Sequence, residues 1–148
     1  MRLNSPDISP GDPIPARFSC EGDDISPQLD WSDVPDRAQE VALICEDPDA
    51  PGGTFIHWAI HGLPPGSPGL ERGRVPAGAV EGVNDYGRAG YGGPCPPRGH
   101  GVHRYFFLLF ALESSIDLAG GYTAGDLREA MEGRILEETS LMGTYKRD

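Results

Sequence analysis

The sequence predicts a mostly β protein, a sandwich or Greek-key arrangement of short strands with one substantial helix near the C-terminal end. Its 148 residues include 21 glycines and 15 prolines, a content typical of many tight turns between short elements. Most apolar residues gather in short runs bounded by turn formers, and strands do not alternate with helices along the chain. We expect one domain spanning residues 1–148.

Extended segments are expected wherever a short apolar or alternating run is bounded by proline, glycine or charge. These segments are a short strand around 14–18, then 26–31, 40–46, 54–63 and 102–112, with a short strand and turn inside 79–87. The run EVALICE at 40–46 is apolar enough for a buried strand. The run VHRYFFLLFAL at 102–112 is too rich in aromatic residues for a comfortable helix.

The helix is expected to begin at Thr123, because Asp126 three residues later completes a capping-box pattern. Leu127, Met131 and Ile135 then recur every fourth residue, and Gly143 is expected to end the helix. This stripe indicates packing against the core.

The charge balance argues against several classes of partner. With 12 basic and 23 acidic residues the formal net charge is −11, and no cluster of lysine or arginine is present. We therefore expect no nucleic-acid binding and no stable membrane association. No apolar stretch reaches transmembrane length, and residues 1–15 lack the apolar region of a signal peptide, so the expected location is cytoplasmic.

The three cysteines, Cys20, Cys45 and Cys95, are odd in number and widely spaced. This pattern favours neither a disulfide framework nor a zinc ribbon. Cys45 lies in an apolar run and is expected in the core, whereas Cys95 lies between two prolines in a polar loop.

Two segments carry the candidate site: DPDAPGGTFIHW at 47–58 and GYGGPCPPRGHGVHRYFF at 90–107. Alternate residues of a strand share one face, which places His103 and Tyr105 together in the second segment. If the two strands pair, His57 joins them, and Asp47 and Asp49 are delivered by the preceding loop. Prolines in both loops restrict φ and hold these side chains in place.

The same alternation separates other residues from this group. Trp58 is expected to face the core, and His61 is expected to have a structural role or lie at the rim. Arg104 falls on the core-facing side of its strand and is expected to form a structural ion pair or hydrogen bond.

Glycines of the second segment add expected main-chain donors. Gly90, Gly92, Gly93, Gly99 and Gly101 leave their amide groups open to close approach, and successive amides can form an anion-binding nest. Imidazole and hydroxyl donors beside two carboxylates suit a zwitterion or a protonated phosphate.

At these residues the chain resembles a known family. DPDAP, the following HW and GPCPPRGHGVHRYFF look like signatures of the phosphatidylethanolamine-binding proteins. The compact length, SPQLDW and GTYKR are similar to the bacterial and archaeal Raf-kinase-inhibitor-like branch. The resemblance extends from about Ser5 to Arg147.

The resemblance implies a β-sandwich with a large central antiparallel sheet, a smaller second sheet and a small anion-binding cavity at one end. The ligand-binding residues it implies are Asp47, Asp49, His57, Gly93, Pro94, His103 and Tyr105. It also implies a phosphate, phosphoethanolamine-type head group or small carboxylate as ligand, a protein partner such as a kinase or another enzyme, and a homodimer. The longer C-terminal extension of the animal proteins is missing, so their kinase-binding surface is not transferred.

Other interpretations compete with a binding site. Asp47 and Asp49 can simply cap a turn. A zinc site at His57 and His61 is not expected, since residues four apart on a strand lie about 13 Å from each other. We therefore expect no metal and no cofactor.

A hydrolase would use Cys95 as nucleophile with His57 or His103 as base. A cysteine between two prolines is equally expected as a structural thiol. The sequence thus favours a non-enzymatic protein that binds a small anionic ligand, with the cysteine hydrolase as the alternative.

Overall fold

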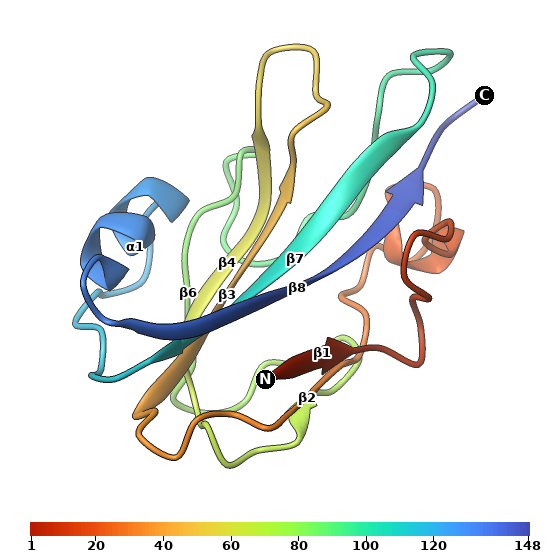
Figure 1. The fold of residues 1–148 in the computed structure, drawn as a ribbon. Coiled ribbons are helices and arrows are strands. Elements are labelled where there is room, and N and C mark those ends of the chain that lie inside the picture. Colours follow the sequence, from red (N-terminus) through yellow and green to blue (C-terminus); the bar gives the residue numbers. More distant parts are fainter.

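The computed structural model describes residues 1–148 and contains two antiparallel sheets and one main helix (Figure 1). The large sheet has the strand order β6 (Val80–Glu81), β4 (Phe55–Leu63), β3 (Glu40–Asp47), β7 (His103–Leu112) and β8 (Ile135–Tyr145). The small sheet has the order β1 (Arg2–Asn4), β2 (Leu29–Ser32) and β5 (Gly69–Leu70). The expected β class and two-sheet architecture are confirmed.

The two faces of the large sheet bury separate apolar cores. On one face, odd-numbered residues of β3 such as Leu43 pack with Trp58 of β4 and with Trp31 of the small sheet. On the other face, even-numbered residues such as Ile44 pack against Leu127 of helix α1. Figure 1 shows α1 and the small sheet on opposite sides of the large sheet. Strand β3 is buried on both sides, which explains its nearly continuous apolar sequence.

The C-terminal region differs from the expected long helix. Helix α1 spans Ala124–Met131 and begins with the expected capping box between Thr123 and Asp126. It ends before Gly133, which has a φ of +79° and turns the chain into β8. Residues 135–145 then pair along the length of β7. The expectation that Ile135 continues the helix and Gly143 ends it is therefore wrong, because pairing with β7 determines the structure of this segment.

Three smaller differences concern the short elements. The segment expected as a strand around 14–18 contains a 3-10 helix at Ala16–Phe18. Strands β1 and β5 were not anticipated, because two or three residues carry no periodic pattern. None of the helices has the length and apolar character needed to cross a membrane.

Candidate functional site

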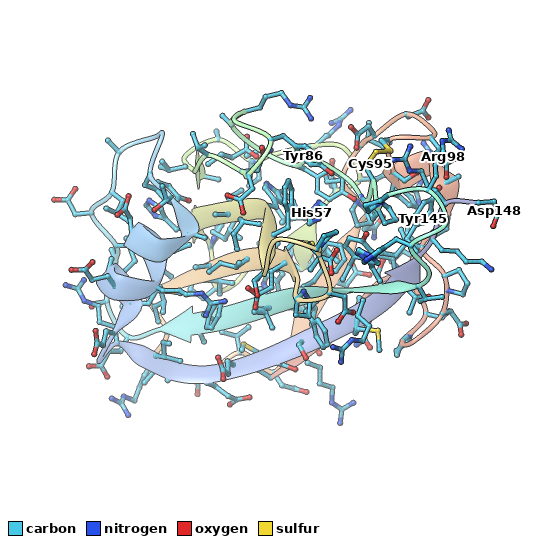
Figure 2. The ribbon with its side chains drawn as sticks, turned by 90° about the horizontal axis from the view of Figure 1, so that it is seen from above. His57, Tyr86, Cys95, Arg98, Tyr145 and Asp148 are labelled. Atoms are coloured by element: carbon cyan, nitrogen blue, oxygen red, sulfur yellow. A yellow bond between two sulfur atoms is a disulfide. The ribbon has the colours of Figure 1, made fainter.

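A cavity of about 210 Å³ lies at one end of the large sheet, where β3 ends and β4 and β7 begin. Four of the residues expected to bind ligand line it: Asp47, His57, His103 and Tyr105. The other lining residues are Ala50, Pro51, Phe55, Tyr86, Cys95, Pro96 and Pro97. Figure 2 shows His57, Tyr86 and Cys95 in the half of the molecule away from helix α1. The two sequence segments thus meet around one hollow.

His57 reaches the cavity through an irregularity in β4. Cys45 of β3 pairs with Trp58, but the next residue, Glu46, pairs with Ile56, so His57 is an extra residue in a β-bulge. Strict alternation would turn His57 to the helix-covered face with Ala59. The bulge instead lets both His57 and Trp58 face the side that carries Tyr105. The two site strands do not pair, the condition under which His57 was placed with His103 and Tyr105, because β3 lies between β4 and β7.

The His57 ring is held as a neutral imidazole with one defined tautomer. Its Nδ1–H donates to the carbonyl oxygen of Gly92 at 2.7 Å, since a carbonyl can only accept. Burial lowers the pKa of His57, partly offset by the Gly92 carbonyl and the Asp47 charge. In this neutral form Nε2 is a hydrogen-bond acceptor.

Asp47, His103 and His100 form a chain of hydrogen bonds from the buried cavity wall to the surface. Nδ1–H of His103 donates to Oδ2 of Asp47 at 2.7 Å, and both side chains are buried. Nε2 of His103 lies 2.6 Å from Nδ1 of the exposed His100. The other Asp47 oxygen accepts the Asp49 amide at 2.7 Å. The buried carboxylate is therefore well satisfied by donors.

Two tyrosines add hydroxyl groups to the site. Burial raises the pKa of Tyr105, and the nearby Asp47 charge raises it further, so the phenol remains a neutral donor. Burial also raises the pKa of Tyr86 to about 12. The Tyr86 hydroxyl donates to the carbonyl of Gly93 at 2.8 Å, and its ring meets His57 and Phe55 edge-on. These rings make one wall of the cavity aromatic.

Asp49, Gly93 and Pro94 do not line the cavity. Asp49 turns outward and binds the Arg104 guanidinium with two bonds of 2.9 Å. That contact lowers the pKa of Asp49 to about 2. Arg104 thus makes the expected ion pair, but on an exposed rather than a core-facing side.

Gly93 and Pro94 lie in a buried loop behind the cavity wall. The Gly93 amide donates to Oδ1 of Asp24 at 2.7 Å, and the Pro94 carbonyl accepts from the Cys20 amide at 3.1 Å. A side chain at Gly93 would collide with the Phe18 carbonyl, 2.2 Å from the position of its Cβ. This loop therefore positions Tyr86 and Cys95, which do line the cavity.

Four of the five open glycine amides expected in this region, all but that of Gly101, are occupied within the protein. Gly90 donates to the Gly82 carbonyl, Gly92 to the His57 carbonyl, and Gly99 to the Arg147 carbonyl. With Gly93 bound to Asp24, a continuous nest of free amides is not formed. Polar contacts to a ligand must come chiefly from side chains.

A disulfide joins Cys20 to Cys95 across 75 residues. The expectation of no disulfide is wrong, because the fold brings together two loops that are distant in sequence. Cys95 in this form has no thiolate, so it cannot act as the nucleophile of the alternative hydrolase. Cys45 is the free cysteine, buried in the core as expected, and burial raises the pKa of its thiol.

Two site residues were missed from the sequence: Tyr86 and His100. Tyr86 belongs to the NDYG turn, where Oδ1 of Asn84 accepts the Tyr86 amide at 2.9 Å. His100 lies three residues before His103, and its flanking glycines have φ of +72° and +95°. The spacing of three residues between His100 and His103 was the one signal in the sequence that could have identified His100 as a site residue. No group of three or more histidine, cysteine, aspartate or glutamate side chains is arranged to hold a metal ion.

Comparison with known proteins corrects the expected cytoplasmic location. LppC of Mycobacterium tuberculosis, named as a proposed lipoprotein, is 40% identical over 146 residues, covering 99% of this chain and 72% of LppC. A lipoprotein name contradicts a cytoplasmic assignment made from the acidic charge and residues 1–15. Net charge describes the surface of the folded domain and does not indicate where in the cell a protein is located.

Three further comparisons agree with the fold and with the family resemblance. A UPF0098 protein of Methanothermobacter thermautotrophicus is 52% identical over 139 residues, covering 90% of this chain and 91% of that protein. The crystal structure of YbcL from E. coli, described as a member of the mammalian PEBP family, superposes with a TM-score of 0.94 at 29% identity, covering 99% of this chain and 98% of YbcL. The family model for phosphatidylethanolamine-binding protein matches residues 4–146. The chain therefore belongs to the phosphatidylethanolamine-binding protein family.

Proposed function

We propose that this protein binds a small anionic ligand in the cavity at the end of the large sheet, without turning it over. The observation that carries the proposal is the convergence of His57, His103 and Tyr105 beside a buried and internally satisfied Asp47. Family membership supports a general ligand-binding role.

The size of the cavity favours a head group over a larger molecule. Pockets for drug-sized ligands have volumes of roughly 300–1,000 Å³. This cavity has about 210 Å³. Phosphate, a phosphoethanolamine-type head group or a small carboxylate matches that volume.

The hydrogen-bonding character narrows the choice to a ligand that both donates and accepts. Tyr105 offers an O–H donor, whereas neutral His57 offers an acceptor at Nε2. A monoprotonated phosphate group presents both kinds of atom, and a carboxylate presents acceptors alone. We therefore expect phosphate to bind more tightly than acetate.

Binding rather than turnover is favoured by the state of the candidate nucleophile. Cys95 is bonded to Cys20.

The exposed Pro51 and Pro97 line the cavity, and a protein partner such as a kinase would contact them to detect an occupied cavity. Regulation of such a partner is the second half of the proposal.

The test uses the side-chain NMR signals of the histidines during titration with inorganic phosphate and, separately, acetate. Phosphate should shift the signals of His57 and His103 at millimolar concentration. His61 lies on the opposite face and serves as an internal reference. Unchanged His57 and His103 signals at millimolar phosphate would contradict the proposal.

A matched pair of variants removes one hydroxyl each. Tyr105→Phe should weaken phosphate binding about fivefold, as expected for one hydrogen bond. Tyr122→Phe removes a hydroxyl that donates to the Val80 carbonyl outside the cavity, and should leave binding unchanged. Equal effects of both variants would indicate a general change in the fold rather than a ligand contact.

A further inference from the structure

The outer edge of β8 has main-chain groups without partners. β8 is the last strand of the large sheet and pairs with β7 alone among the strands (Figure 1). At its C-terminal end, the main chain of Met142 and Thr144 points outward and bonds to residues 11–14. The register from Glu137 to Tyr145 is regular, so the amides and carbonyls of Glu138 and Ser140 also point outward. No segment of the chain bonds to them.

The N-terminal segment already uses this edge as a strand would. Gly11 donates to the Met142 carbonyl at 2.8 Å, and Ile14 donates to the Thr144 carbonyl at 2.7 Å. Pro13 forms an isolated parallel bridge with Thr144. One half of the β8 edge therefore already binds an extended segment. The other half, around Glu138 and Ser140, is a direct continuation of the same edge.

A groove runs beside the open half of this edge, between β8 and the end of α1. Its apolar part includes Ile135, whose side chain is among the few large hydrophobic ones exposed to solvent. Three exposed carboxylates line it: Glu129, Glu132 and Glu138. None of the three has an ion-pair partner, whereas the one basic lining residue, Arg128, is paired with Glu46 at 3.1 Å. The groove thus combines unpaired negative charge with an apolar contact.

We propose that the open half of the β8 edge, with this acidic groove, binds an extended basic segment of a partner protein by adding it as a strand. Main-chain bonds to Glu138 and Ser140 provide affinity, and alternate side chains of the added strand fall on the groove face. Lysine or arginine at those positions meets Glu129, Glu132 and Glu138. This surface is separate from the anion cavity, so the inference does not depend on the proposed ligand.

A second copy of the chain fits the edge less well. Antiparallel pairing of two β8 strands across this segment would bring Glu138 of each copy close to that of the other, whereas Glu137 is already paired with the N-terminal ammonium group. Like charges on paired strands destabilise them, and charged edges discourage such association. The same acids favour a basic strand, which decides between the two occupants.

The experiment titrates the whole protein with an acetylated, amidated peptide of alternating lysine and valine, followed by amide NMR at low ionic strength. The expected result is saturable shifts at Glu138, Ser140 and the end of α1. The same peptide with glutamate in place of lysine should produce none. Combining Glu132→Lys with Glu138→Lys should weaken binding at least about tenfold, while Glu71→Lys combined with Asp23→Lys, an equal charge change at two exposed positions outside the groove, should not.

Ser140→Pro separates strand addition from simple charge attraction. The Ser140 amide points away from β7, so proline removes a donor to the partner and keeps the ladder to β7. A loss of about fivefold in affinity is expected. The proposal would be overturned if this variant bound the peptide fully or if the wild type did not bind it. It would also be overturned if sedimentation experiments showed that the shifts along β8 come from self-association of the protein.

Discussion

Strand β3 begins and ends with a buried carboxylate, and each one pairs with a histidine on an opposite face of the sheet. Glu40, at the start, lies 3.3 Å from Nδ1 of His61 on the face that carries α1. Asp47, at the end, accepts from Nδ1 of His103 at 2.7 Å on the other face. The chemical groups are nearly the same in the two regions. Their surroundings differ.

The Glu40–His61 pair is closed. Nε2–H of His61 donates to the Leu118 carbonyl at 2.9 Å, and the Glu40 carboxylate accepts from the Ile116 amide. Nδ1 of His61 is buried beside Glu40 without a hydrogen-bond partner. The bonds that are formed hold the loop around Ile116 and Leu118, so this pair has a structural role.

The Asp47–His103 pair opens onto the cavity. Its second ring nitrogen meets His100, an exposed side chain between two glycines of positive φ, and not a fixed carbonyl. The two pairs therefore differ in the contact of the second histidine nitrogen. In the structural pair this nitrogen is bound to a main-chain carbonyl, and in the pair available for recognition it contacts an exposed side chain. The following predictions test that contrast, from the largest expected effect to the smallest.

The disulfide should support the open region far more than the closed one. Replacing Cys20 and Cys95 together by serine removes a link that closes 75 residues of chain. The free energy of unfolding should fall by about 4 kcal/mol, measured by urea denaturation. The NMR signals of His57 and His103 should move, because Cys95 lines their cavity, while those of His61 stay in place. Equal movement at His61 would show that the two ends of β3 are not independent.

Removing the two carboxylates should have unequal effects. Glu40→Ala leaves the Ile116 amide without its acceptor and removes the carboxylate beside Nδ1 of the buried His61, and it should cost about 3 kcal/mol of stability. Asp47→Ala should cost about 1–2 kcal/mol, because water entering the cavity can replace the lost acceptor. Urea denaturation measures both, with Glu40→Gln and Asp47→Asn as controls that keep an acceptor. A larger loss for Asp47→Ala would contradict the assignment of open and closed pairs.

The sequence predicts the parts of this molecule whose signal is local. The strands at 40–46, 54–63 and 102–112 were found because each is a long apolar run bounded by turn formers. Thr123 and Asp126 marked the helix start because a capping box is complete within four residues. The convergence of Asp47, His103 and Tyr105 follows from motifs directly joined to those strands.

Features that depend on tertiary contacts were not predictable in this way. Residues 135–145 carry an ambiguous pattern, and pairing with β7 decides their structure. The bulge that turns His57 into the cavity follows from the register with β3, which no local pattern encodes. The bond between Cys20 and Cys95 likewise joins loops that meet only in the folded chain.

The pH dependence of stability should reveal the neutral state of His57. Burial lowers its folded pKa below the unfolded value of about 6.5. Its contribution is therefore fully present above about pH 6.5 and is lost as pH falls through that value toward the folded pKa, because the unfolded chain takes up the proton first. In His57→Gln the loss of stability between pH 7 and 5.5 should be smaller than in the wild type, by at most about 1.4 kcal/mol, the limit for one proton over one pH unit. Identical pH profiles for the two proteins would contradict a neutral buried His57.

The smallest effect is expected at Asp49, which belongs to the same DPDAP segment as Asp47 but faces outward. Its contact with Arg104 lowers its pKa to about 2, so the pair contributes above the unfolded pKa of about 4 and is lost as pH falls through about 2. Because Arg104 is largely exposed, Asp49→Asn should cost less than about 1 kcal/mol at pH 7 in urea denaturation. Phosphate-induced shifts of His57 and His103 should persist in this variant and disappear in Asp47→Ala. If Asp49→Asn also abolished these shifts, both aspartates of the segment would act on the ligand. The inward direction of the Asp47 side chain and the outward direction of the Asp49 side chain would then not distinguish a ligand-binding residue from a stabilising one.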